Sequence, residues 1–176
     1  FIVGLPRSGK TIVESILACN QSLIPVGESE VFSDAIDIFL SEKNIKSLHE
    51  LYINKLGLNS TNASYVSNTN PINYIYSGLI LTHLKESRII YCYRNILDNI
   101  YELYSKNLSE KYTFKNSILE SIKISFKIKS LMNSYNSTFK DRIYFLDYDQ
   151  LVLEPNSQIN SLISWLGWKE DQKYLK

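Results

Sequence analysis

The first eleven residues, FIVGLPRSGKT, place several phosphate-binding groups in one short loop. Residues 4–11 match the pattern G-x-x-x-x-G-K-[ST], in which a glycine-rich turn points backbone N–H groups at a phosphate. A helix that starts directly after the turn adds partial positive charge. The anion ligands expected from this loop are Arg7, Ser8, Gly9, Lys10 and Thr11. The loop therefore predicts binding of a phosphorylated nucleotide.

A second candidate anion site lies at Arg94, where the apolar stretch 89–93 gives way to a helical pattern. A guanidinium at such a junction can form a two-pronged hydrogen bond to a phosphate, with helix N–H groups behind it. The alternative is a surface arginine that pairs with Asp98, four residues further on. Together with the phosphate loop, the arrangement favours two separated anion sites.

Both segments resemble parts of the sulfotransferases that use 3′-phosphoadenosine 5′-phosphosulfate (PAPS). FIVGLPRSGKTIVESIL is similar to their 5′-phosphosulfate-binding loop, above all in the branch of the tyrosylprotein and the bacterial tetratricopeptide-linked enzymes. The family usually has P-R-S-G-T-T, where this chain has Lys10 for the first threonine. The segment ending at Arg94 resembles the family's 3′-phosphate-binding strand. PAPS carries phosphates on both ends of its ribose, whereas ATP carries them all on one side.

The resemblance also supplies acid–base candidates. The element Gly27-Glu28-Ser29-Glu30 is similar to one that holds the family's general base, which implies that Glu28, ahead of Glu30, takes the acceptor's proton. The alternative is that these carboxylates cap the following helix. Residues 68–78, NTNPINYIYSG, resemble D-K-x-P-x-N-F-x-x-x-G without its Asp-Lys pair, so Lys10 would replace the missing lysine. The predicted catalytic residues are Glu28, Lys10 and Arg7.

Other positions extend or weaken the resemblance. Tyr148 falls where the family has a tyrosine near the nucleotide, although a packed junction residue is an equal interpretation. Glu102 stands where the family has a serine that contacts the 3′-phosphate. Ser105 or Lys106, one turn later, would compensate, and Lys106 is the predicted nucleotide ligand of the two.

Three functions follow from these residues. The first is sulfuryl transfer from PAPS to a hydroxyl of an acceptor, such as a protein tyrosine or a carbohydrate, without a metal. The second is a magnesium-dependent P-loop kinase or ATPase, in which Thr11 binds the metal and the strand ending at Asp147 supplies a carboxylate. The third is a degenerate sulfotransferase domain that binds without turnover, suggested by Glu102, Thr69 and Ser29.

The bulk composition limits the partners. The chain of 176 residues has a formal net charge of +1, which does not favour a nucleic-acid surface. It has no apolar run of about 18 residues, so no membrane span is expected. Because the sequence starts inside a strand, we interpret residues 1–176 as one domain from a longer chain. The resemblance leaves room for a homodimer, for flanking tetratricopeptide repeats, and for a bacterial cytoplasm or a eukaryotic Golgi lumen as the compartment.

The predicted fold is a P-loop-type α/β domain of three layers, with a central parallel sheet flanked by helices. We expect strands over residues 1–4, 64–67, 88–93 and 142–148, because apolar runs there alternate with amphipathic stretches. Cys19 and Cys92 are expected to be buried thiols. The expected helices cover residues 10–19, 29–40, 47–55, 72–85, 95–106, 115–135 and 155–166.

Overall fold

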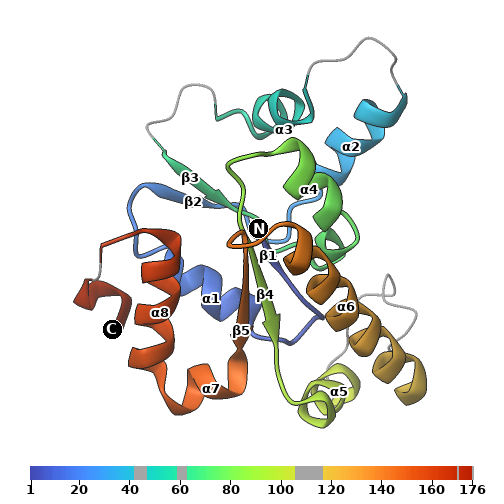
Figure 1. Cartoon of the computed structure of the whole chain (residues 1–176), viewed down its shortest axis with the longest axis vertical. Coiled ribbons are helices and arrows are strands. Elements are labelled where there is room, and N and C mark those ends of the chain that lie inside the picture. Colours follow the sequence, from blue (N-terminus) through green and yellow to red (C-terminus); the bar gives the residue numbers. More distant parts are fainter. Residues whose placement is uncertain (42–46, 59–62, 106–116, 170, 176) are drawn as a thin grey trace.

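The computed structural model is an α/β domain with parallel strands at its centre and helices on both sides (Figure 1). It describes residues 1–41, 47–58, 63–105, 117–169 and 171–175. Three strands form one parallel sheet in the order β1-β4-β5: β1 (Ile2–Val3), β4 (Ile89–Tyr93) and β5 (Ile143–Asp147). Two more, β2 (Leu23–Pro25) and β3 (Tyr65–Ser67), form a parallel pair. The predicted fold class is therefore confirmed.

The pair β2-β3 continues the sheet beyond β1. The amide of Ile2 donates to the carbonyl of Asn68, directly after β3, at 2.9 Å. The register of the larger sheet sets Ile2 opposite Ile90 and Ile90 opposite Tyr144. Because all strands run parallel, the segments that follow β1, β3, β4 and β5 meet at one edge, here called the carboxyl edge.

Alternation along the strands builds a core on each face of the sheet. Ile90 and Cys92 of β4 pack in one core with residues of α1 (Lys10–Leu17) and α8 (Pro155–Leu166). Ile89 and Tyr91 pack in the other core, with helices that include α4 (Ser77–His83) and α6 (Ile118–Thr138). In Figure 1, α8 and α6 accordingly lie on opposite sides of β4 and β5.

The remaining helices complete these layers and the carboxyl edge. They are α2 (Val31–Ser41), α3 (Leu48–Leu56), α5 (Ile96–Ser105), α7 (Tyr148–Leu153) and the short 3₁₀ helices η1 (Pro71–Tyr74) and η3 (Gln172–Leu175). None of the helices in the described ranges is long and apolar enough to cross a membrane.

Four expectations about local structure were wrong. The strand β2 was not foreseen, because it is three residues long and ends in Pro25. The helix expected over 72–85 is divided into η1 and α4. Cys19 is exposed in the turn after α1, while Cys92 is buried as expected. The short helix α7 also lies where only a strand-to-helix junction was expected.

Candidate functional site

A cavity of about 550 Å³ opens at the carboxyl edge, between the loop after β1 and the start of α5. It collects side chains from five segments of the chain. Its lining residues are Pro6, Arg7, Gly9, Lys10, Thr11, Ile12, Glu28, Arg94, Glu102 and Tyr148. Seven of the predicted site residues are in this set, namely Arg7, Gly9, Lys10, Thr11, Glu28, Arg94 and Tyr148.

The loop from Gly4 to Gly9 has the unusual backbone that the glycines make possible. Gly4 has φ 147° and Gly9 has φ 96°, where L side chains rarely fit. A Cβ on Gly4 would lie 2.2 Å from the carbonyl oxygen of Cys92, and one on Gly9 would lie 2.2 Å from the Tyr148 ring. Arg7 also has a positive φ, 66°. The loop is thus held tightly between the ends of β4 and β5.

Ser8 lies just behind this surface and does not line the cavity. Its side chain is 2% exposed, and within the described residues its Oγ has no hydrogen-bond partner. A buried hydroxyl without a partner loses free energy, which a ligand oxygen or a water could restore.

Lys10 lines the cavity from the first turn of α1. It is 4% exposed, and its Nζ donates to the carbonyl of Leu5 at 3.1 Å. Burial lowers the pKa of Lys10 to about 8, although the nearby Glu28 and Cys92 act in the opposite direction. An ammonium has three donors, so Lys10 retains donors for an anion in the cavity.

Arg94 faces the loop from the end of β4. Its guanidinium lies over the ring of Tyr148, 5.1 Å from the centroid, and Nη1 donates to the carbonyl of Arg7 at 3.5 Å. Among the described residues, its buried Nε has no partner. The alternative pair with Asp98 does not form there, because Arg94 turns toward Tyr148 and the loop. The base of α5 is instead fixed by Asp149, whose Oδ2 accepts from the amide of Asn95 at 2.6 Å.

Arg7 and Glu102 approach each other across the cavity. Nε of Arg7 lies 3.9 Å from Oε2 of Glu102, and both side chains are partly exposed. Sequence reasoning placed a carboxylate near the second anion site but did not foresee its pairing with the loop arginine, because the two residues are 95 positions apart.

Glu28 was expected either to act as the general base or to cap the helix that follows it. Helix α2 begins at Val31, whose amide donates to Ser29 Oγ at 3.3 Å. Glu28 itself lies in the preceding loop and lines the cavity, whereas Glu30 does not.

A cluster of buried asparagines that sequence reasoning missed supports the backbone at Glu28. Nδ2 of Asn70 donates to the carbonyls of Glu28 and Ser29, at 3.4 and 3.2 Å. The amide of Thr69 donates to the carbonyl of Gly27 at 2.8 Å. Asn68 accepts from the amide of Asn70 at 2.9 Å. The run NTNPIN was the available signal, since four polar residues within six positions are unusual beside buried strands.

Two remaining expectations concern residues outside this cavity. Asp147, the carboxylate required by the magnesium interpretation, accepts from the amides of Asp149 and Gln150 and so caps α7. The described residues contain no cluster of three or more metal-ligating side chains. Lys106 lies outside the described residues.

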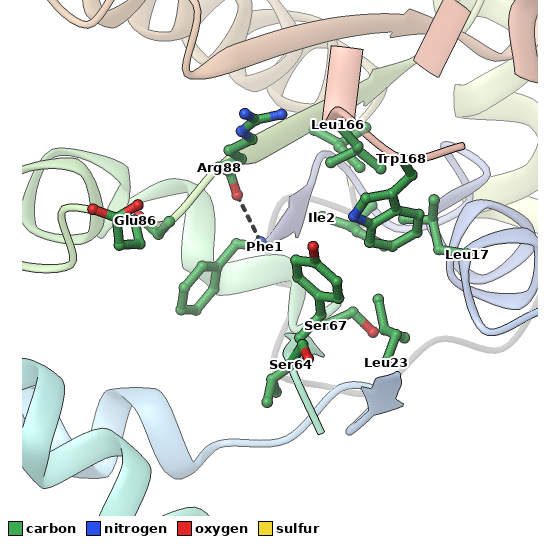
Figure 2. Close-up of a pocket in the computed structure, with 14 residues that line it drawn as sticks. Phe1, Ile2, Leu17, Leu23, Ser64, Ser67, Glu86, Arg88, Leu166 and Trp168 are labelled. Carbon is green, nitrogen blue, oxygen red and sulfur yellow. Dashed lines mark hydrogen bonds between the residues drawn. The ribbon is translucent and has the colours of Figure 1, made fainter. Parts of the chain in front are cut away.

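A second cavity, of about 470 Å³, lies at the opposite, amino edge of the sheet (Figure 2). It is lined mainly by apolar side chains, including Leu17, Leu23 and Trp168. The backbone nitrogen of Phe1 donates to the Arg88 carbonyl there at 2.8 Å, the bond drawn in Figure 2. This cavity contains none of the predicted site residues.

Residues 37–172 match the model of a sulfotransferase family. The chain belongs to the sulfotransferase family. The matched range contains Arg94, Glu102 and Tyr148 and begins after the phosphate loop. This sulfotransferase chain is also 24% identical over 195 residues to an uncharacterised protein of Aquifex aeolicus (strain VF5). The match covers 97% of this chain but only 26% of that relative's length.

Solved sulfotransferase structures have the same fold. The sulfotransferase domain of the curacin biosynthetic pathway superposes with a TM-score of 0.66 at 16% identity, over 99% of this chain and 75% of its own. The sulfotransferase STF1 of Mycobacterium tuberculosis H37Rv gives 0.66 at 11% identity, over 99% and 68%. The sulfotransferase domain of the Synechococcus PCC 7002 olefin synthase gives 0.65 at 17% identity, over 99% and 74%.

Proposed function

We propose that this sulfotransferase chain moves a sulfuryl group from PAPS to a hydroxyl of an acceptor, without a metal ion. The observation that carries the proposal is the cavity at the carboxyl edge. It brings the phosphate loop, Arg94 and Glu28 to one space, although they come from separate segments of the chain. A cavity of about 550 Å³ falls in the range of ligand pockets.

The cations of the cavity would hold the two ends of the donor. Lys10, the loop amides and the hydroxyls of Ser8 and Thr11 would bind the 5′-phosphosulfate, as helix N-termini do with anions. Arg94 would bind the 3′-phosphate, and Tyr148 beneath it would keep the guanidinium in place.

The transfer itself needs alignment, charge neutralisation and removal of one proton. The acceptor oxygen forms a bond to sulfur while the bond from sulfur to the phosphate oxygen breaks, and that oxygen keeps the electron pair. The acceptor proton goes to the carboxylate of Glu28. Lys10 and Arg7 stabilise the negative charge that develops on the departing adenosine 3′,5′-bisphosphate.

Titration calorimetry tests the donor. The protein is titrated with adenosine 3′,5′-bisphosphate and with ADP, each with magnesium and with EDTA. We expect the bisphosphate to bind equally well in both buffers, because the site uses cationic side chains. Binding of ADP that needs magnesium, with no binding of the bisphosphate, would contradict the proposal and favour a kinase or ATPase.

Turnover tests the base. Labelled PAPS is incubated with the protein and a panel of phenolic, carbohydrate and alcohol acceptors, and transfer of the label is followed. Glu28→Gln should lower turnover by about 10²- to 10⁴-fold, the usual contribution of a general base, while bisphosphate binding persists. Glu30→Gln is the matched control and should stay within a fewfold of the unmodified protein. Binding without transfer to any acceptor would favour the degenerate, non-catalytic domain.

A further inference from the structure

The cavity carries a negative charge at the end where a second phosphate would bind. Glu102 projects into it from α5, the helix that starts directly after Arg94. Three cationic side chains and two carboxylates line the cavity, so its positive charge is largely balanced before a ligand enters. Glu28 comes from the loop that follows β2, whereas Glu102 comes from α5, the helix that follows Arg94.

Glu102 also forms an ion pair with Arg7, a cation that would otherwise be available to bind the nucleotide. Its Oε2 lies 3.9 Å from Nε of Arg7, whose carbonyl accepts from Nη1 of Arg94 at 3.5 Å. A phosphate placed between the two arginines would approach this carboxylate and compete with it for Arg7. Like charges in one site oppose each other, so the carboxylate lowers the affinity for a phosphate in that position.

A ribose hydroxyl has the opposite preference. A carboxylate accepts hydrogen bonds only, and a hydroxyl can donate one. In dinucleotide-binding folds an acidic residue holds a ribose hydroxyl, and an arginine accommodates the phosphate that replaces it. The same chemistry applies to any carboxylate that faces a ribose.

We propose that Glu102 sets the donor specificity of this site by reducing its preference for a ribose 3′-phosphate over a ribose 3′-hydroxyl. The inference rests on the proposed function, since it takes the ligand to be an adenine nucleotide bound through its 5′-phosphate at the loop. The site therefore accepts adenine nucleotides that carry a 3′-hydroxyl as well as those that carry a 3′-phosphate.

Calorimetry with two probes that differ in one group tests this. The dissociation constants of adenosine 5′-monophosphate and adenosine 3′,5′-bisphosphate are measured for the unmodified protein and for Glu102→Gln. In the unmodified protein we expect the two constants to lie within about tenfold. Glu102→Gln should raise their ratio in favour of the bisphosphate by about another tenfold, the size expected for one partly screened charge. Asp98→Asn removes the same charge from the same helix outside the cavity and should leave the ratio unchanged.

The following results would overturn the inference. A preference above about tenfold for the bisphosphate in the unmodified protein shows that the site does not accept the two nucleotides comparably, and an unchanged ratio in Glu102→Gln shows that the carboxylate does not discriminate. An equal change in Asp98→Asn assigns the effect to net charge instead of Glu102. Should Glu102→Gln fail to fold by circular dichroism, Glu102→Ser takes its place. If neither nucleotide binds to any variant, the proposed function fails first and the inference with it, whereas an unchanged ratio with measurable binding leaves the proposed function intact.

Discussion

An arginine stands at each end of strand β4, and the two guanidinium groups differ in their hydrogen bonds to the protein. Arg88 precedes the strand and Arg94 follows it, and each guanidinium lies over an aromatic ring, at 5.2 Å from Trp165 and 5.1 Å from Tyr148. At the amino edge, Arg88 also donates to the carbonyl of Trp165. At the carboxyl edge, Arg94 makes one long hydrogen bond of 3.5 Å to the backbone, and within the described residues its buried Nε has no partner.

We infer from this difference that an arginine next to a cavity is not by itself an anion site. What matters is whether protein acceptors already occupy its donors, since an unpaired buried donor costs free energy that a ligand can recover. Arg142 illustrates the other extreme, because it donates to the carbonyls of Leu81, Leu84 and Ser87 at 2.7 to 3.0 Å and so fixes the end of α4. Among the described residues, only the carboxyl edge combines an arginine that has an unpaired buried donor with a glycine-rich turn.

The largest effect should separate the two arginines directly. Arg94→Gln should weaken binding of adenosine 3′,5′-bisphosphate by about 10- to 100-fold, since hydrogen bonds to a charged group contribute about 1.5–3 kcal/mol. Arg88→Gln removes the same charge at the other end of the strand and should leave binding within about twofold. Titration calorimetry measures both.

The same two variants should also differ in stability. Arg88→Gln loses its bond to Trp165 and should lower the denaturation midpoint, whereas Arg94→Gln should alter it less. Equal losses of affinity in the two variants would mean that the distinction between the two edges is wrong.

Local sequence patterns predicted much of the carboxyl edge. The glycines at positions 4 and 9 permit a backbone that other residues rarely adopt, so the loop could be recognised from its spacing alone. Arg94 was predicted as an anion ligand because an apolar strand ends there, and its role stays a prediction. The position of Glu28 beside the cavity followed from the resemblance to sulfotransferases, and its role stays a prediction.

Contacts between distant segments could not be predicted in the same way. The pair of Arg7 with Glu102 and the stacking of Arg94 on Tyr148 join residues that are 95 and 54 positions apart. Nor did any local period indicate that Asn70 would hold the backbone of Glu28, because that bond depends on β2 and β3 lying side by side. The individual candidate groups could thus be predicted from the sequence. Which of their hydrogen-bond donors remain unpaired depends on tertiary packing, which the sequence patterns did not indicate.

A smaller effect, with a pH signature, should distinguish Lys10 from both arginines. The pKa of Lys10 is lowered by burial to about 8, and a bound anion would raise it. Nucleotide binding should then take up a proton, and affinity should fall by up to about tenfold per pH unit above pH 8. Lys10→Arg keeps its charge throughout and should bind with little change between pH 7 and 9. An unmodified protein with constant affinity over that range would show that Lys10 does not contact the anion.

The lowered pKa of Lys10 should also make the stability of the fold depend on pH. The direction is opposite to that of nucleotide affinity, because stability should rise with pH. Because the pKa of Lys10 is lower in the folded state than the ordinary 10.5, the unfolded chain binds more protons between about pH 8 and 10.5. The contribution of Lys10 to the free energy of unfolding should therefore rise with pH across that window. Denaturant titrations of the unmodified protein and of Lys10→Met, compared at pH 7.5 and 9.5, isolate this contribution.

The smallest effect concerns the two aromatic rings under the arginines. Tyr148→Leu removes the face on which Arg94 rests, a contact of about 0.5–1 kcal/mol where it is partly exposed, and should weaken bisphosphate binding by about two- to fivefold. Trp165→Leu removes the equivalent ring under Arg88 and should leave binding unchanged while it lowers stability, because Trp165 packs in the core of that face. Calorimetry together with thermal denaturation distinguishes the two losses. If Tyr148→Leu lowers only stability, the ring is a packed junction residue, and the orientation of Arg94 must come from the loop backbone alone.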